Sequence, residues 1–270
     1  MAQKPAKIHV GIGGWTFAPW RSAFYPPGLP HAKELAYASR RLTSIEINGT
    51  FYRSQSAATF RKWASETPDG FVFSVKGPRF VVQRGVLAEA GDSLKRFFES
   101  GVLELADRLG PVLWQLAPTK KFDEADFGAF LELLPAALDG RKIRHVVEAR
   151  HPSFKTSAFL TLLRKFGVAV AFSEHATYPA IADVTADFVY ARLQKCEETI
   201  PTGYEAEALD HWAARACSWA AGSEPADLPR VEPDREAKAE PRDVYVYFIH
   251  EGKVRAPAAA TALIERLGRR

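Results

Sequence analysis

The most constraining feature of this sequence is the regular alternation of two kinds of segment. Short runs rich in β-branched and aromatic residues, typical of buried strands, are separated by longer segments in which apolar residues recur with helical spacing. Strands that alternate with helices pair in parallel through crossover connections. The eight runs predicted to be strands span residues 9–13, 44–48, 71–76, 112–116, 144–148, 168–173, 188–193 and 244–249. The segments predicted to be helices span residues 32–41, 57–66, 93–109, 124–137, 157–166, 205–221 and 257–267.

Eight repeats of this kind close naturally into a ring, so the sequence predicts an α/β fold, a TIM-type (β/α)8 barrel. An open, doubly wound sheet is the main alternative, but the chain has no GxGxxG turn of the kind that binds phosphate in that fold. Because barrels run to about 250 residues as one unit, the 270 residues predict a single domain over residues 1–270.

Two segments depart from the alternation. Residues 174–187 contain Tyr178 and Pro179 but no helical periodicity, so we expect the helix between the sixth and seventh strands to be irregular or missing. Residues 222–242 carry prolines among many charges and almost no large apolar residue, which predicts an exposed, mobile loop inserted before the last strand.

Composition limits the compartment and the partners. Lys plus Arg number 36 against 32 for Asp plus Glu, a net charge of +4 that allows a phosphate-bearing partner without requiring one. Cys196 and Cys217 have no paired spacing and no neighbouring histidine pair, so we expect reduced thiols. Because the chain has neither a signal-like apolar segment nor an apolar run of about 20 residues, we expect a cytoplasmic protein outside the membrane.

Side-chain alternation along each strand places polar residues inside the barrel at the carboxyl ends of the strands, where barrel enzymes carry their active sites. A charge in a barrel interior costs several kcal/mol unless it is paired or solvated. One interpretation is a structural network in which these charges neutralise one another; the other is an anion site clamped by Lys76, Arg150 and Arg192. The residues predicted to face this site are Ser44, Glu46, Asn48, Ser74, Lys76, Gln115, Glu148, Arg150, Ser173, Glu174, His175, Tyr190, Arg192, Tyr245 and Tyr247.

The first two loops at this end are rich in aromatic residues. We expect most of these rings to pack the long first loop onto the barrel, but Trp15 and Tyr52, nearest the strand ends, are candidates to stack on a base or a sugar. His151, just beyond Arg150, is a candidate proton shuttle, although a single histidine at a strand end is at least as often a hydrogen-bonded structural residue.

Several ordered motifs resemble one family over essentially the whole chain. The sequence resembles the proteins grouped as domain of unknown function 72, the YecE-like proteins, and the resemblance implies a TIM-type barrel with a polar pocket at the strands' carboxyl ends but supplies no reaction. It departs from the family pattern at Leu193-Gln194-Lys195, where a His-Gly pair is usual, and at Ile249-His250, where two asparagines are frequent. The matching blocks are Gly11 to Trp15, Trp20, Phe24 to Pro26, Glu46 to Tyr52, Trp63, Thr67-Pro68, Phe71, Phe73, Lys76, Leu109-Gly110, Gln115-Leu116, Glu148 to Phe154, Tyr190, Arg192, Tyr245 and Tyr247-Phe248.

The first hypothesis for function is an enzyme that uses carboxylate acid and base chemistry on a phosphate-bearing or otherwise anionic substrate. We expect the pKa of one carboxylate to be lowered by neighbouring cations and that of the other to be raised by burial. The sequence does not choose between a hydrolase, an isomerase and a lyase, and we predict no cofactor. The candidate catalytic residues are Glu46, Glu148 and His151, and the candidate substrate-binding residues are Trp15, Asn48, Tyr52, Lys76, Gln115, Arg150, Arg192 and Tyr247.

Two alternatives stay open. A metal-dependent phosphodiesterase of the endonuclease type would need ligands from among Glu46, Glu148, His151, Glu174, His175 and His250, but nearby cations would repel a metal. A non-catalytic protein that binds nucleic acid would use the basic residues Arg141, Lys142, Arg144, Arg266, Arg269 and Arg270, although charge runs of this kind are usually solvated faces. We further predict that neutral residues in place of Glu148 or Arg150 abolish ligand binding and leave the fold intact.

Overall fold

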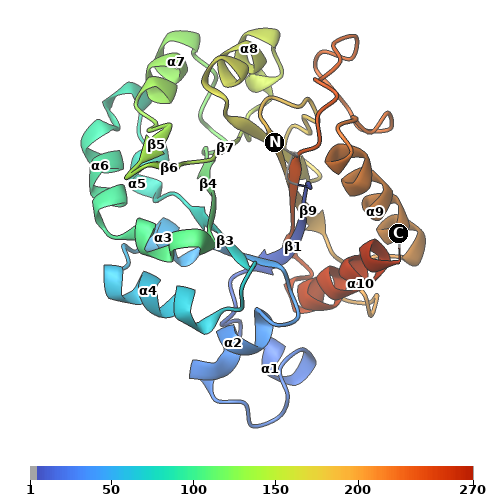
Figure 1. Cartoon of the computed structure of the whole chain (residues 1–270). Coiled ribbons are helices and arrows are strands. Elements are labelled where there is room, and N and C mark those ends of the chain that lie inside the picture. The colour runs from blue at the N-terminus through green and yellow to red at the C-terminus, as the bar shows by residue number, and fades with distance from the viewer. Residues whose placement is uncertain (1–4, 270) are drawn as a thin grey trace.

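In the computed structural model, which describes residues 5–269, eight parallel strands close into a barrel surrounded by helices (Figure 1). Around the ring the strands follow the order β1-β10-β9-β8-β7-β4-β3-β2. The predicted (β/α)8 barrel is confirmed, since each of the eight predicted strands forms one strand of the barrel. These strands are β1 (Ile8–Gly13), β2 (Ser44–Ile47), β3 (Val72–Lys76), β4 (Leu109–Gln115), β7 (His145–Glu148), β8 (Ala169–Glu174), β9 (Phe188–Lys195) and β10 (Asp243–Glu251).

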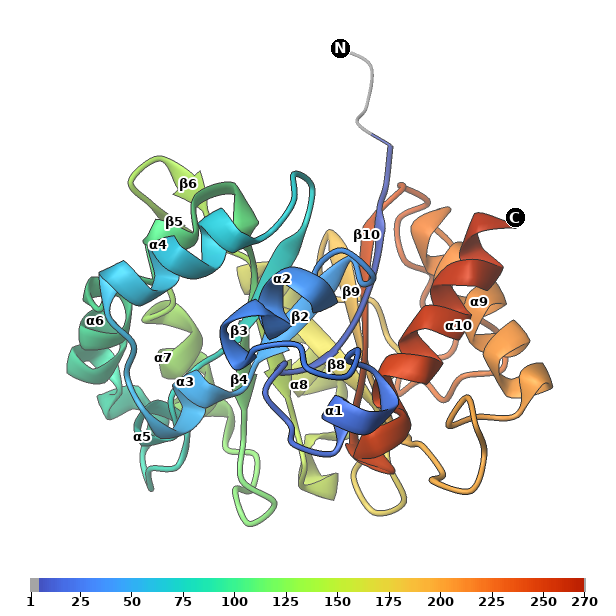
Figure 2. The same ribbon diagram turned by 90° about the horizontal axis from the view of Figure 1, so that it is seen from below.

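Three of the helices that cover the barrel begin at residues whose side chains cap them. The side chains of Ser56, Asp123 and Thr156 accept hydrogen bonds from backbone N–H groups in the first turns of α4, α7 and α8. Short helices α1 and α3 lie near the carboxyl ends of the strands, at the bottom of Figure 2. The α-helices are α1 (Trp20–Ala23), α2 (Glu34–Ala38), α3 (Gly49–Tyr52), α4 (Ala57–Glu66), α5 (Arg79–Val82), α6 (Gly91–Glu99), α7 (Glu124–Glu132), α8 (Ser157–Phe166), α9 (Ala206–Ala220) and α10 (Ala256–Gly268).

Two helix predictions were too long. The helix predicted over residues 93–109 ends with α6, because Gly101 adopts a φ of 103° and a 3-10 segment, Val102–Arg108, follows. The helix predicted over residues 124–137 ends with α7, after which β5 (Ala137–Leu138) and β6 (Arg141–Lys142) form a hairpin. The hairpin turn is Asp139-Gly140, and both residues have positive φ. An Asp-Gly pair is typical of such turns, but the helical periodicity of the preceding residues led us to predict a helix up to residue 137.

Other connections have no regular structure. The connection between β8 and β9, all of it described, contains no helix, as predicted. Residues 222–242 form neither helix nor strand, and Asp183 accepts hydrogen bonds from the backbone N–H groups of Val231 and Glu232 within this segment. None of the described helices is both long and apolar enough to cross a membrane.

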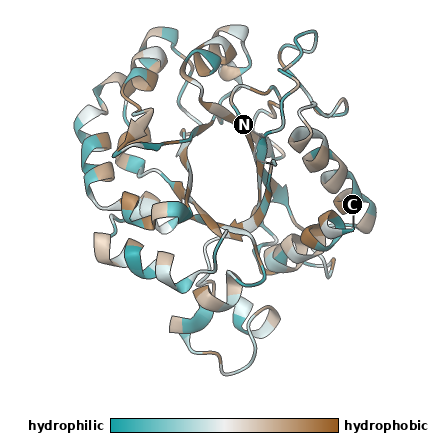
Figure 3. Ribbon diagram, in the orientation of Figure 1, coloured by the Kyte–Doolittle hydropathy of each residue, from teal (hydrophilic) through white to brown (hydrophobic). Residues whose placement is uncertain are grey.

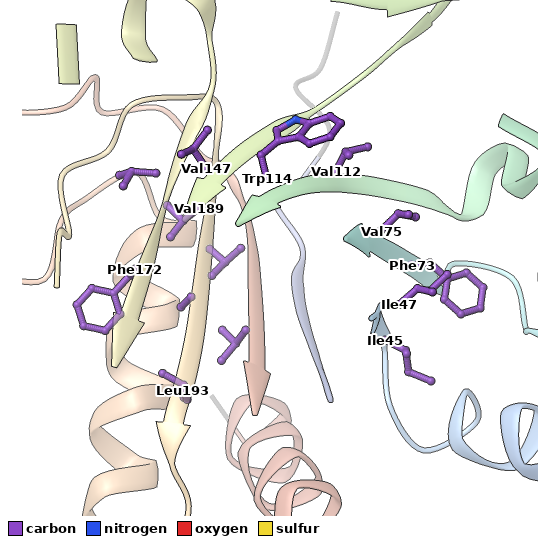
Figure 4. Packing of buried hydrophobic residues seen from close by; sticks show 14 of the residues in the cluster. Ile45, Ile47, Phe73, Val75, Val112, Trp114, Val147, Phe172, Val189 and Leu193 are labelled. Atoms are coloured by element: carbon purple, nitrogen blue, oxygen red, sulfur yellow. The ribbon is translucent and has the colours of Figure 1, made fainter. Parts of the chain in front are cut away.

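The barrel separates two apolar clusters. The larger one lies between the strands and the helices, where side chains such as Phe73, Trp114 and Phe172 point outward (Figure 4). The ring of strands is accordingly largely hydrophobic, while hydrophilic residues gather on the outer helices and loops (Figure 3). The smaller cluster fills the barrel interior and consists of Leu113, Val146, Ala169, Ala171, Phe188, Tyr190, Tyr245, Tyr247 and Ile249. Charged side chains inside the barrel therefore lie next to this apolar and aromatic filling.

Candidate functional site

One arginine joins two carboxylates from distant strands inside the barrel. Arg192 on β9 donates from Nε and Nη2 to the two oxygens of Glu46 on β2, at 3.1 and 3.0 Å. Its Nη1 donates to Oε1 of Glu148 on β7 at 2.6 Å. All three side chains are at most 4% exposed, so this is a buried ion triad of the kind that geometry and hydrogen bonding must compensate.

Further donors saturate both carboxylates. Glu46 also accepts from the Tyr190 hydroxyl at 2.7 Å. Oε1 of Glu148 accepts from the Ser173 hydroxyl at 3.0 Å, and Oε2 accepts from Gln115 Nε2 at 2.5 Å and Arg150 Nε at 3.1 Å. Every carboxylate oxygen of the pair thus accepts at least one hydrogen bond, and most accept two.

This saturation determines the protonation of the pair. Burial by itself would raise the pKa of each carboxyl, but Arg192 and the hydrogen bonds outweigh burial in both cases. The pKa of Glu46 is lowered, and that of Glu148 falls to about 2 with Arg150 as a further contributor. The expectation that one carboxyl pKa would be raised was wrong, because one guanidinium serves both groups.

Lys76 is the cation of this group that has no carboxylate partner. Within residues 5–269, no acidic oxygen lies within 4.0 Å of its Nζ, and the side chain is only 7% exposed. The ammonium instead lies 4.2 Å from the centre of the Phe51 ring, a cation–π contact. Burial, followed by repulsion from Arg192, lowers the pKa of Lys76 to about 8 although Glu46 and Glu148 oppose the shift.

The main chain around Lys76 is held from two sides. Its carbonyl oxygen accepts a hydrogen bond from the Thr50 hydroxyl at 2.7 Å, and the next N–H, that of Gly77, donates to Leu113 O at 2.8 Å. A Cβ at Gly77 would lie 2.3 Å from the Trp114 ring, so only glycine lets the end of β3 approach β4 this closely. The end of β3 thereby places the amine inside the barrel mouth.

A layer of hydroxyl groups accompanies the ion triad. The Tyr190 hydroxyl also contacts Ser74 Oγ at 2.8 Å, and Tyr247 contacts Ser44 Oγ at 2.6 Å. Burial raises the pKa of both phenols, so they stay protonated. Tyr247, predicted to bind substrate, is fully buried among these groups, and it therefore contributes to the barrel filling in this structure.

Four other predicted site residues lie apart from the charged network. Trp15 packs edge-on against Trp63 and tilted against Phe73, a ring that faces the helices. Tyr52 is 70% exposed. His151 accepts the Ser153 N–H at Nδ1 and caps the 3-10 turn Pro152–Phe154, and Asn48 donates to the Glu46 carbonyl at 3.4 Å. The network therefore unites Glu46, Gln115, Glu148, Arg150 and Arg192, with Lys76 beside it.

The sequence prediction missed three residues of the mouth. Phe51 supports Lys76, and the Tyr178 ring lies 4.5 Å beneath the Arg150 guanidinium. Gln194 follows Arg192 by two residues on β9 and therefore shares its inward face. It is 1% exposed, and neither atom of its amide has a hydrogen-bond partner in the part of the chain that the structure describes. Gln194 could have been noticed because the sequence departs from the family pattern there. Tyr178 could not, because it lies in the segment without periodicity.

One group of side chains offers ligand atoms for a metal ion. His175, His250 and Glu251 hold their ligand atoms within 4.8 Å of one another. His175 Nδ1, however, accepts hydrogen bonds from the backbone N–H groups of Thr177 and Tyr178, so the neutral ring keeps its proton on Nε2. A metal at either nitrogen would first have to displace a proton or these hydrogen bonds.

Four of the basic residues suggested for nucleic acid pair with acidic residues, whereas Arg269 is exposed and has no ion pair among the described residues. Arg141 pairs with Asp107, Lys142 with Asp187 and Arg144 with Asp243. Arg266 pairs with Asp210 on α9. Arg270 lies outside the described residues. The paired cations do not form an uncompensated surface.

Comparison with known proteins places this barrel in a family. A family model described as "Protein of unknown function DUF72" matches residues 9–270. The UPF0759 protein YunF of Bacillus subtilis (strain 168) is 30% identical over 118 residues, 41% of this chain and 40% of that protein, so the match spans less than half of the relative.

Solved structures show the same architecture. A DUF72 family protein from Thermotoga maritima MSB8 superposes with a TM-score of 0.72 at 22% identity, over 97% of this chain and 99% of that one. Another from Enterococcus faecalis V583 has a TM-score of 0.69 at 15% identity, over 98% and 99% of the two chains. At such identities these likenesses show the fold and nothing about chemistry.

Proposed function

Because the chain belongs to the DUF72 family, whose description assigns no reaction, we propose a function from the site itself. The barrel mouth binds a small anionic molecule, a phosphate or carboxylate compound, and the protein is an enzyme that acts on it by acid and base chemistry. The observation that carries this proposal is the ammonium of Lys76, which ends a largely buried side chain and has no acidic partner within 4.0 Å among the described residues.

The balance of charge supports an anionic ligand. Arg150, Arg192 and Lys76 are three cations, and Glu46 and Glu148 are two anions, so the group carries one positive charge in excess when Lys76 is protonated. A network that served only to neutralise itself would not leave an unpaired cation on a largely buried side chain, since a partly desolvated charge without a partner is costly. A bound anion would complete the balance.

The same geometry assigns the catalytic roles differently from the sequence prediction, which gave them to the two carboxylates. Glu46 and Glu148 are ionised and fully hydrogen-bonded, so they act as counter-ions that orient Arg192 and Arg150. A group that exchanges protons near neutral pH needs a pKa close to that range. Lys76, with its pKa lowered to about 8, meets this requirement better than either carboxylate. We therefore assign proton transfer to Lys76 and anion binding to Arg150 with Lys76.

Calorimetric titration tests the proposal with inorganic phosphate and with lactate as probes. Lys76→Met and Arg150→Met should each weaken binding by about tenfold or more, which corresponds to about 1.4 kcal/mol. The matched control is Lys155→Met, because Lys155 is exposed and follows the same strand as Arg150. Equal affinities for the wild type, the two site variants and the control would contradict an anion site here.

A metal-dependent phosphodiesterase is the second candidate, favoured by the proximity of His175, His250 and Glu251. Titration of the protein with Mn2+ and with Zn2+, followed by hydrolysis assays on bis(p-nitrophenyl) phosphate with and without chelator, tests this candidate. Loss of metal binding and of hydrolysis in His250→Asn would support it. Metal-independent hydrolysis, or no hydrolysis with either ion, would count against it.

A further inference from the structure

The amine of Lys76 can form a covalent bond as well as carry a proton. We propose that Lys76 is a nucleophile that condenses with a small carbonyl compound bearing a carboxylate or a phosphate, forming an imine. The inference rests on the proposed function, because the site must hold the anionic group of the substrate before the carbonyl can react.

The surroundings of Lys76 are those that make a lysine nucleophilic. A lysine is activated when it is desolvated or when other cations stand near it. The Lys76 residue is only 7% exposed, and the Phe51 ring lies against its ammonium. The positive charges of Arg192 and Arg150 repel that of the ammonium. A salt bridge would hold the amine in its protonated, unreactive form, and the carboxylates of Glu46 and Glu148 are already occupied by the arginines.

The backbone that carries the amine is also fixed before any substrate arrives. Lys76 is the last residue of β3, and the peptide group between Lys76 and Gly77 is fixed at both ends: its C=O accepts from the Thr50 hydroxyl and its N–H donates to Leu113 O. A nucleophile carried at the end of a barrel strand and fixed in this way loses little freedom on reaction. The control lysine, Lys155, is exposed, whereas the Lys76 side chain is largely buried.

Gln194 supplies a second, independent observation that points to a polar ligand. Both amide atoms of this buried side chain lack a partner among the described residues, and such groups carry a free-energy cost that a ligand can remove. A β-bulge lies opposite it, since Leu193 pairs with Phe248 but Lys195 pairs with Glu251. The amide N–H groups can donate to, and the amide oxygen can accept from, the polar groups of a ligand in the barrel mouth.

The condensation balances without any further reactant. The deprotonated amine of Lys76 attacks the carbonyl carbon, and the π electron pair of the C=O bond moves to oxygen, which takes up a proton. The C–O bond of this carbinolamine then breaks, and the oxygen leaves as water. Overall, R–NH3+ and O=CR2 give R–NH+=CR2 and H2O, so both hydrogens of the water come from the ammonium. The iminium keeps the positive charge, and the charge balance with Glu46 and Glu148 is unchanged.

Reductive trapping tests the inference on the full-length protein. Pyruvate and dihydroxyacetone phosphate serve as the carboxylate and phosphate probes, each with sodium cyanoborohydride, which reduces iminium ions to stable secondary amines. Peptide mass spectrometry then locates the modified lysines in the wild type, in Lys76→Arg, and in the control Lys155→Arg. Lactate and glycerol 3-phosphate, which carry the same anions without a carbonyl, measure anion binding alone.

We expect at least one carbonyl probe to modify Lys76 about tenfold more than Lys155, because the buried amine is both activated and positioned. Lys155→Arg should keep this adduct. Lys76→Arg should lose it and still bind lactate or glycerol 3-phosphate, since the charge remains. If Lys76→Arg does not fold, the modified position in the wild type decides by itself.

Two results would overturn the inference: adducts spread evenly over exposed lysines, or no adduct on Lys76 with either probe. The control anions show which claim has failed. Binding of lactate or glycerol 3-phosphate to the wild type without a Lys76 adduct removes imine formation and leaves the proposed anion site. Absence of binding by all four compounds removes both.

Discussion

Arg192 on β9 binds both oxygens of Glu46 on β2 through two nitrogens, at 3.1 and 3.0 Å, although 146 positions separate the two residues in the chain. The same guanidinium also donates to Glu148, so Arg192 is paired with two carboxylates and is not free to bind a third anion. This pairing leaves Lys76 as the cation without a carboxylate partner among the described residues, and it changes what each member of the group can do.

Replacement of Glu148 should destabilise the protein strongly. Glu148→Gln removes the charge that compensates Arg192 and Arg150, and breaking a buried pair by removing one partner costs about 3–5 kcal/mol. Urea unfolding at pH 7 measures the loss, with the exposed pair Lys95 and Glu99 as control through Glu99→Gln, which should cost less than about 1 kcal/mol. We therefore expect a neutral residue to leave the fold intact at Arg150, which is partly exposed, more readily than at Glu148.

Acid should abolish the contribution of Glu148. Its pKa is about 2 in the folded protein and near 4.5 when unperturbed, so the stabilisation is complete above pH 4.5 and is lost as the pH falls toward 2. The difference in unfolding free energy between the wild type and Glu148→Gln should accordingly shrink between pH 5 and pH 2.5. A constant difference over this interval would contradict the assigned protonation.

Alkali should stabilise the wild type relative to Lys76→Met, because only the wild type has a titrating group at this position. The pKa of Lys76 is about 8 when folded and near 10.5 when unperturbed, so the unfolded chain binds the proton more tightly. The penalty for burying the charge is present below pH 8 and is relieved as the pH rises toward 10.5. Lys76→Met should be the more stable protein at pH 7, by up to about 3 kcal/mol, and should lose this advantage by pH 10. Chemical denaturation at both pH values decides; a less stable variant at pH 7 would show that the ammonium is compensated.

Glycine at position 77 should be required for the position of Lys76. Gly77→Ala places a methyl group 2.3 Å from the Trp114 ring, and such overpacking costs about 1–3 kcal/mol. Gly85→Ala is the control, because a Cβ there meets no atom within 4 Å among the described residues. Thermal unfolding measures stability, and phosphate titration should show weaker binding in Gly77→Ala alone. Unchanged stability and binding would mean that β3 and β4 can separate without moving the amine.

The Gln194 amide should lower the stability of the protein and strengthen ligand binding. Gln194→Leu replaces two unpartnered amide atoms with apolar ones, and the free energy of unfolding should stay the same or rise by about 1–3 kcal/mol. Binding of pyruvate or dihydroxyacetone phosphate should weaken at the same time. Urea unfolding and calorimetry measure the two effects, with Gln83→Leu as an exposed control. A destabilised Gln194→Leu with unchanged binding would show that the amide serves the fold.

Much of the barrel could be predicted from local pattern. The apolar spacing located all eight strands, and the period of two along β2, β3 and β9 identified Glu46, Lys76 and Arg192 as inward residues. The pattern failed where two signals overlapped, as at Asp139-Gly140, where a hairpin turn followed directly on a helix.

What the sequence by itself determined was the ring of strands and the set of polar side chains that face its axis, because both follow from periodicities between near neighbours. Only the tertiary structure decided which of those side chains pair with one another. Arg192 pairs with two carboxylates and Trp15 packs outside the barrel, while Lys76 has no carboxylate partner and the amide of Gln194 has no hydrogen-bond partner among the described residues. The physical reason is that hydrogen bonds across a barrel depend on distances of about 3 Å between atoms of distant strands, and closure of the ring alone sets those distances.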